Sequence, residues 1–194
     1  MRFDIRPVQL ANTLDTALRM VRYGLCNPVR AGLVDDPWMW PWSTLRDLSG
    51  AAYPIWTPRA AIAEALEIPA NRLLAKLTNL AESRSRAPRI VPVTMATFEA
   101  MRTAVASALR MQEADVYAHP LGRKLMVQAS DAIALPCIGR VADELGCARC
   151  TIYRDRHPCH SALDAVLLCL GDARLRRGPD AVAPKTDERW RAGM

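Results

Sequence analysis

A phenol, an amide and a guanidinium recur at helical spacing near the start of the chain. Arg19, Tyr23 and Asn27 are each four residues apart, so on an α-helix they lie one above the other along a single face. A tyrosine phenol can act as a nucleophile, but with a pKa of about 10 it is a poor one at neutral pH without a metal site beside it. Whether the Tyr23 phenol can react therefore depends on the groups that lie beside it.

An apolar pattern predicts the helix that carries this face, over residues 10–26. Five aliphatic residues recur at intervals of three or four, namely Leu10, Leu14, Leu18, Val21 and Leu25. Such spacing indicates one buried face. Tyr23 lies on the opposite, exposed side, and Pro28 is expected to end the helix.

The residues around Tyr23 also form a long string without gaps. The stretches in question are Arg22–Tyr23, Asn27–Val34 and Trp40–Ser43, followed by Arg46 and Gly50. This string resembles the REP-associated tyrosine transposases, single-tyrosine DNA transposases of the HUH superfamily, over roughly residues 10–56. The resemblance implies that Tyr23 attacks a DNA phosphodiester and that Asn27 helps to bind a divalent metal, Mg²⁺ or Mn²⁺.

One part of the family pattern is missing from this chain. The family's other metal ligands are two histidines flanking a hydrophobic residue, on a strand upstream of the tyrosine. Here the 22 residues before Tyr23 contain no histidine, and the chain's three histidines are His119, His157 and His160. Because phosphoryl transfer relies on metal for charge neutralisation, we expect a transposase-derived chain without the α/β catalytic sheet. The alternatives are a compact active variant, or an enzyme completed by a partner or by upstream sequence.

Composition favours a helical, DNA-compatible protein outside membranes. Of 194 residues, 51% are hydrophobic, and 26 basic against 20 acidic residues give a net charge of +6. Ala- and Leu-rich runs favour helices, no apolar run reaches 18 residues, and the N-terminus lacks a signal-peptide pattern. We expect an all-α fold, no membrane partner and a bacterial, cytoplasmic, nucleoid-associated location.

The six cysteines are expected to be reduced thiols. Cys147 and Cys150, followed by His157, Cys159 and His160, resemble a zinc-ligand pattern only irregularly. The other interpretation has Cys147 and Cys150 packing as small hydrophobic residues. We expect no zinc.

Two small helical units are predicted. Residues 1–81 form the transposase-like unit, 82–93 a linker, 94–177 a DNA-binding unit and 178–194 a disordered tail. Four of the five tryptophans lie between residues 38 and 56. They indicate either a local core or a surface for base stacking, and core packing is favoured.

Residues 138–156 match a helix-turn-helix. Such a unit needs a small residue in its first helix, a glycine at the turn and a buried β-branched residue in its second helix. Ala142, Gly146 and Ile152 occupy these places. The alternative is an ordinary helical hairpin, but the turn glycine, the apolar pattern and the basic second helix agree with one another.

The second helix of this unit would be the recognition helix. Its candidate DNA-binding residues are Arg149, Thr151, Arg154 and Arg156. Arg149 is favoured as the base reader. Asp155 would repel phosphate unless it is turned away or paired with an arginine. The segment resembles a generic bacterial helix-turn-helix and, more loosely, the DNA-binding domain of the initiator DnaA, whose Asp-His-Ser-Thr signature is absent.

Together these features predict a DNA-binding protein derived from a REP-associated tyrosine transposase and unable to cut DNA alone. It would bind duplex DNA through the helix-turn-helix, and single-stranded hairpin DNA is a second candidate partner. The alternatives are an active single-strand transposase completed from elsewhere, and a helix-turn-helix transcriptional regulator that acts as a homodimer on a palindromic target.

Overall fold

The computed structural model describes residues 13–80, 96–134 and 137–176, where the chain forms helices, turns and loops but no strand. This confirms the all-α prediction. The helices are α1 (Leu14–Arg30), α2 (Thr44–Ser49), α3 (Arg59–Ala65), α4 (Ala70–Leu80), α5 (Phe98–Leu109), α6 (Pro120–Ala132), α7 (Ile138–Glu144), α8 (Arg149–Arg156) and α9 (Leu163–Gly171), with short 3₁₀ turns η1 (Pro37–Met39), η2 (Glu113–Asp115) and η3 (Ala173–Leu175). None of the described helices is long and apolar enough to cross a membrane.

Helix α1 begins and ends later than its sequence predicts. Thr13 caps it by accepting a hydrogen bond from the backbone N–H of Thr16. The prediction that Pro28 ends the helix is wrong, because Pro28 lies inside its last turn. A proline there removes the bond that its own N–H would donate and crowds the carbonyl four residues earlier, yet the N–H of Ala31 still bonds to the carbonyl of Asn27 at 2.9 Å. The chain leaves the helix at Gly32, whose φ of 68° is in the left-handed region.

The apolar stripe of α1 is only partly buried. Leu25 is 9% exposed, whereas Leu14 is 45% exposed, and Leu18 and Val21 are half-buried. The reason is tertiary, since α1 packs mainly against α4 and η1. Leu10, the first residue of the stripe, lies outside the described residues.

The tryptophans between residues 38 and 56, expected to form either a local core or a surface for base stacking, differ in burial. Trp38 is 1% exposed and belongs to the core, as core packing predicts. Trp42 and Trp56 are instead 48% and 58% exposed, and their rings stack with centroids 6.1 Å apart. Core packing is therefore right for Trp38 and wrong for this exposed pair.

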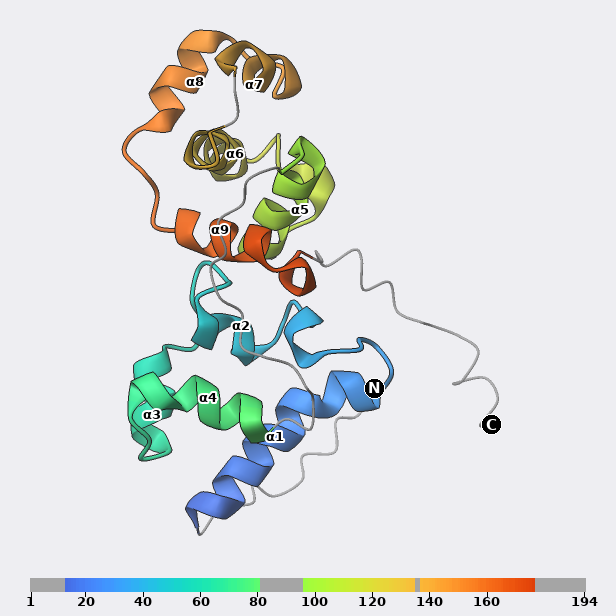
Figure 1. The fold of residues 1–194 in the computed structure, drawn as a ribbon, viewed down its shortest axis with the longest axis vertical. Helices are drawn as coiled ribbons and strands as arrows, with labels where there is room; N and C mark the ends of the chain where they lie inside the picture. Colours follow the sequence, from blue (N-terminus) through green and yellow to red (C-terminus); the bar gives the residue numbers. More distant parts are fainter. Residues whose placement is uncertain (1–12, 81–95, 135–136, 177–194) are drawn as a thin grey trace, which may run out of the picture.

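Helices α5, α6 and α9 pack against one another, and α9 lies on the side that faces α2 (Figure 1). Thr97 caps α5 by accepting a hydrogen bond from the backbone N–H of Ala100, and α5 ends at Arg110 in the left-handed conformation. One hydrophobic cluster continues from Leu45 and Leu48 of α2 to Leu170 of α9. Helices α1–α4 and the trio α5, α6 and α9 thus share a core.

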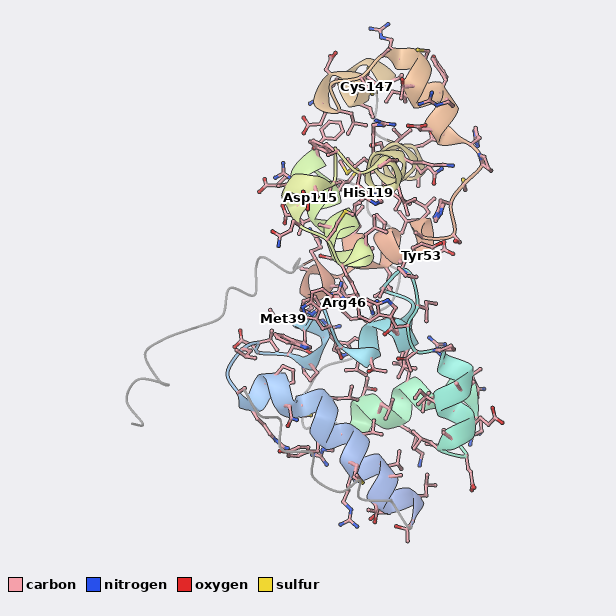
Figure 2. All side chains as sticks on the ribbon, turned by 180° about the vertical axis from the view of Figure 1, so that it is seen from behind. Met39, Arg46, Tyr53, Asp115, His119 and Cys147 are labelled. Carbon is pink, nitrogen blue, oxygen red and sulfur yellow. The ribbon has the colours of Figure 1, made fainter. Side chains whose placement is uncertain are left out.

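Buried polar contacts join the same two groups. Arg46 is fully buried where they meet (Figure 2), and its Nη2 donates to the carbonyl of Leu175 at 2.8 Å. The backbone N–H of Tyr53 donates to the carbonyl of Ala108. The division into two units remains a prediction, and its linker (82–93) and its tail beyond Arg176 lie outside the described residues.

Candidate nucleic-acid interface

Helices α7 and α8, which the sequence predicts to be a helix-turn-helix, lie at one end of the molecule and are joined by a short turn (Figure 1). Four residues separate the helices, and Cys147 marks their turn (Figure 2). Gly146 in this turn has a φ of 58°. Side chains with a Cβ rarely adopt that conformation, so the glycine is required here for the reason predicted.

The contact between the two helices is small and apolar. Val141 and Ala142 of α7 and Ile152 of α8 are each at most 5% exposed, and they pack on Val127 of α6. Leu145 is partly buried against them. The predicted roles of Ala142 and Ile152 are therefore confirmed, and the pair of helices rests on α6.

Gln128 of α6 fixes the end of α8. Its side chain is buried, and its Nε2 donates to the carbonyls of Asp155 and Pro158, each at 3.0 Å. Its Oε1 accepts from the backbone N–H of His160 at 2.9 Å. One amide thus satisfies three backbone groups, which holds the orientation of α8 on the body of the protein.

Asp155, the acidic residue of the predicted recognition helix, does not face outward, where it would repel phosphate. Its side chain points inward, with 12% exposed, and lies 3.4 Å from Arg123 Nε and 3.4 Å from Arg154 Nε. Of the two interpretations, burial with an arginine partner is therefore right. The carboxylate takes the place of the usual late hydrophobic residue and is directed away from a ligand on the outer side of α8.

The four candidate DNA-binding residues differ in their surroundings. Arg154 is largely exposed, at 70% of its side chain, and Arg149 is also exposed, whereas Thr151 is half-buried. Arg156 forms an ion pair with Asp131 of α6. That bond, together with the negative charge of Asp131, raises the pKa of Arg156. Arg149 and Arg154 are thus the two better placed for DNA.

Two outward-facing residues of α8 were missing from the sequence-based set. Cys150 is exposed, and Tyr153 is 60% exposed. Buried Ile152 and Asp155 define the inner side of the helix. Counting about 100° per residue from Ile152 places Cys150 and Tyr153 outward, so the pattern contained this signal. The exposure of Cys150 also corrects the prediction that both cysteines of the turn pack as small hydrophobic residues, which holds only for Cys147.

The first residue of α8 lies close to the start of α7. A Cβ placed on Gly139 would be 3.2 Å from Arg149 Nη2 and 3.5 Å from Cys137 Sγ. Hydrogen bonds from the backbone N–H groups of Arg140 and Gly139 lower the pKa of the Cys137 thiol, and the positive charge of Arg149 adds to the effect. Positive charge and backbone donors therefore gather beside this end of α8.

The second candidate site is the exposed face of α1. Tyr23 is 60% exposed and Asn27 is exposed one turn further on, which confirms the predicted orientation. The Arg30 guanidinium lies over the Tyr23 ring, 5.1 Å from its centroid. Arg19 forms an ion pair with Asp15 at 2.8 Å. The basic neighbour of the phenol is therefore Arg30 rather than Arg19.

A cavity of about 400 Å³ lies on another side of α1, where Val21 and Leu25 form part of its wall. It lies between Met20 and Gly24 of α1 and the ring of Trp42, with Ser43 and Thr44 also in its wall. In the part of the chain that the structure describes, no three His, Cys, Asp or Glu residues come together as metal ligands. The role of Asn27 as a metal ligand stays a prediction.

Comparisons of the chain with protein-family models, with curated proteins and with solved structures found no match.

Proposed function

We propose that the chain binds double-stranded DNA through α8, docked in a major groove. The observation that carries the proposal is the pairing of a fixed inner side with a free outer side. Ile152 and Asp155 hold α8 against the body of the protein, while Arg154 extends from its exposed side and Arg149 is exposed at its first residue, beside the start of α7. Recognition helices are presented in this way, with their early residues toward base edges.

Charge and resemblance support DNA as the partner. The net charge of +6 favours association with a polyanion. Arginine is the residue best suited to guanine edges and to phosphates, because its planar guanidinium donates several hydrogen bonds in a fixed geometry. The resemblance of residues 10–56 to REP-associated tyrosine transposases also points to DNA.

A salt series on duplex DNA tests the proposal. Log affinity should fall linearly with log salt concentration as the protein displaces counterions from phosphates. Arg154→Ala should reduce the slope by about one, as the loss of a phosphate contact does, and Arg149→Ala should weaken the preferred sequence by about 1–3 kcal/mol.

Arg72→Ala is the matched control, because Arg72 is an exposed arginine on α4, far along the chain from α8. It should leave both the affinity and the slope unchanged. If Arg149→Ala and Arg154→Ala also leave duplex affinity unchanged at low salt, α8 is not the DNA-binding element and the proposal is wrong.

A second candidate function rests on α1. Tyr23 and Asn27 share an exposed face, as a tyrosine transposase would require. Strand cleavage there would need the two-histidine metal site from another polypeptide or from upstream sequence, and Mg²⁺ or Mn²⁺ with it. We therefore propose duplex binding as the activity of this chain and single-strand cleavage as conditional on such a partner. The transcriptional-regulator alternative requires a homodimer, which sedimentation at several concentrations would detect.

A further inference from the structure

We infer that Tyr153 is a specificity-determining residue of α8 and that its ring contacts the methyl group of a thymine in the major groove. This inference rests on the proposed binding of duplex DNA by α8. It assigns sequence preference to a residue outside the four arginine and threonine candidates, and it names the base that the residue would recognise.

The position of Tyr153 on α8 is the first argument. Residues of an α-helix are about 100° apart, so Tyr153 lies about 40° from Arg149, one turn further along the same side. Counted from Ile152, which is buried between α8 and α6, Arg149 lies about 60° and Tyr153 about 100° around the helix. If Arg149 meets one base edge, Tyr153 faces a base pair further along the same groove.

The ion pairs on α8 supply the second argument. Arg156 is held by Asp131, and Arg154 lies beside the carboxylate of Asp155. Counted in the same way, Arg156 lies about 40° and Arg154 about 200° from Ile152, so Tyr153 lies between them on the surface of the helix. Tyr153, with 60% of its surface exposed, is the largest hydrophobic surface on α8.

Contacts at two places hold α8 in one orientation and so define the direction in which Tyr153 points. The buried Ile152 fixes one side of α8, and Gln128 fixes its last turn through the carbonyl of Asp155. A helix held at both places cannot rotate without breaking these contacts. A tyrosine has few rotatable bonds, so it presents its ring at low conformational entropy cost.

The chemistry of the groove identifies the base. The thymine methyl group is the one apolar group that the four natural bases display in the major groove, and aromatic or small apolar side chains contact it. An exposed ring with Arg149 on one side and Arg154 on the other fits such a methyl group, while Arg154 reaches a phosphate. Uracil presents the same hydrogen-bonding groups without the methyl and is therefore the direct probe.

The experiment begins with duplexes selected from a random pool by the full chain. In the selected duplex, each thymine is replaced in turn by deoxyuridine, and the affinities are compared at fixed salt. We expect one replacement to weaken binding about fourfold, the value of one buried methyl group. The other replacements should have little effect.

Variants assign that thymine to Tyr153. Tyr153→Ala should bind the thymine and deoxyuridine duplexes equally, whereas Tyr153→Phe, which keeps the ring, should still distinguish them. Ile55→Ala is the matched control, because Ile55 is also an exposed hydrophobic residue, at 53%, but lies between α2 and α3, and it should retain the full discrimination. Far-UV circular dichroism checks that each variant is folded.

The inference is overturned if no thymine position responds to deoxyuridine, or if Tyr153→Ala discriminates as the unmodified protein does. It is also overturned if Tyr153→Phe weakens all duplexes alike, since the hydroxyl would then be binding phosphate. If these results appear while Arg149→Ala still weakens duplex binding, only the role of Tyr153 is wrong. If Arg149→Ala and Arg154→Ala have no effect either, the proposed function itself has failed.

Discussion

Asp47 Oδ1 and Arg110 Nη2 lie 2.6 Å apart, with 3% of each side chain exposed, although 63 residues separate them in the sequence. Asp47 also accepts a hydrogen bond from the backbone N–H of Trp56, and Arg110 lies 3.7 Å from the centroid of the Trp56 ring. This buried pair therefore joins α2 to the end of α5 and positions the exposed Trp56 at the same time.

Asp47→Asn should destabilise the protein strongly. The substitution leaves the Arg110 guanidinium buried without its counter-charge, and breaking a buried pair in this way costs about 3–5 kcal/mol. Urea unfolding followed by tryptophan fluorescence would measure the loss. The exposed pair Arg19–Asp15 is the control, and Asp15→Asn should change stability by less than about 1 kcal/mol. Equal effects of the two substitutions would contradict the structural role given to Asp47.

Replacing each of two helical glycines with alanine should change the stability of the protein in opposite directions. A Cβ on Gly122 of α6 would lie 2.4 Å from the carbonyl oxygen of Val116, whereas a Cβ on Gly24 of α1 would meet nothing within 4 Å. Gly122→Ala should therefore destabilise by about 1–3 kcal/mol through overpacking. Gly24→Ala should stabilise by about 0.5–1 kcal/mol, because alanine favours the helix. Thermal unfolding of both variants gives the comparison, and a neutral Gly122→Ala would refute the close approach of α6 to η2.

Gly146→Val should abolish duplex binding while the rest of the fold remains. Valine resists the φ of 58° at this turn, so α7 and α8 should lose their relative orientation. Duplex affinity measured by fluorescence anisotropy should fall to the level of the Arg149→Ala, Arg154→Ala double variant. Gly50→Val provides the control, because Gly50 also has a positive φ, of 83°, but lies at the end of α2. Its effect should appear in stability rather than in affinity per folded molecule.

Cys137 should be the fastest of the exposed thiols to react at neutral pH. Backbone N–H groups of Arg140 and Gly139 lower the pKa of its thiol, so more thiolate is present at pH 7. Alkylation with iodoacetamide, read by mass spectrometry between pH 5 and 9, should show Cys137 ahead of the exposed Cys150 and Cys159. Its rate should reach half of its maximum at a lower pH than that of a model thiol. A rate for Cys137 no higher than that of Cys150 at pH 7 would argue against the hydrogen bonds at the start of α7.

With Mg²⁺ or Mn²⁺, the protein alone should form no covalent adduct with single-stranded hairpin DNA. The reason is chemical: the chain supplies Tyr23 and Asn27 but no pair of histidines flanking a hydrophobic residue. Denaturing electrophoresis with labelled hairpins would detect a phosphotyrosine adduct. The appearance of an adduct that Tyr23→Phe removes would reinstate Tyr23 as the nucleophile of a working transposase.

Local signals in the sequence were enough to predict the helix that carries Tyr23 and the turn between α7 and α8. The spacing of apolar residues and the turn at Gly146 act over a few residues, so the sequence alone identifies them. The exposure of Tyr23 follows from the same periodicity. One error came from a local rule applied too strictly, at Pro28, which α1 tolerates in its last turn. Another arose because tertiary packing leaves Leu14 of the predicted apolar face 45% exposed.

Only the tertiary structure decided which polar side chains are exposed and which are buried or paired. Asp155 and Arg156 look alike in the sequence as charged residues of α8, yet one points into the protein and the other binds Asp131 of α6. The burial of Arg46 and the pairing of Asp47 with Arg110 likewise depend on helices distant in the chain. Helical periodicity determines the faces of each helix, whereas the burial of a charge depends on the partner that the whole fold places opposite it. The sequence by itself therefore determined the helices and their turns, and the packing of α8 on α6 decided which side chains of α8 stay exposed.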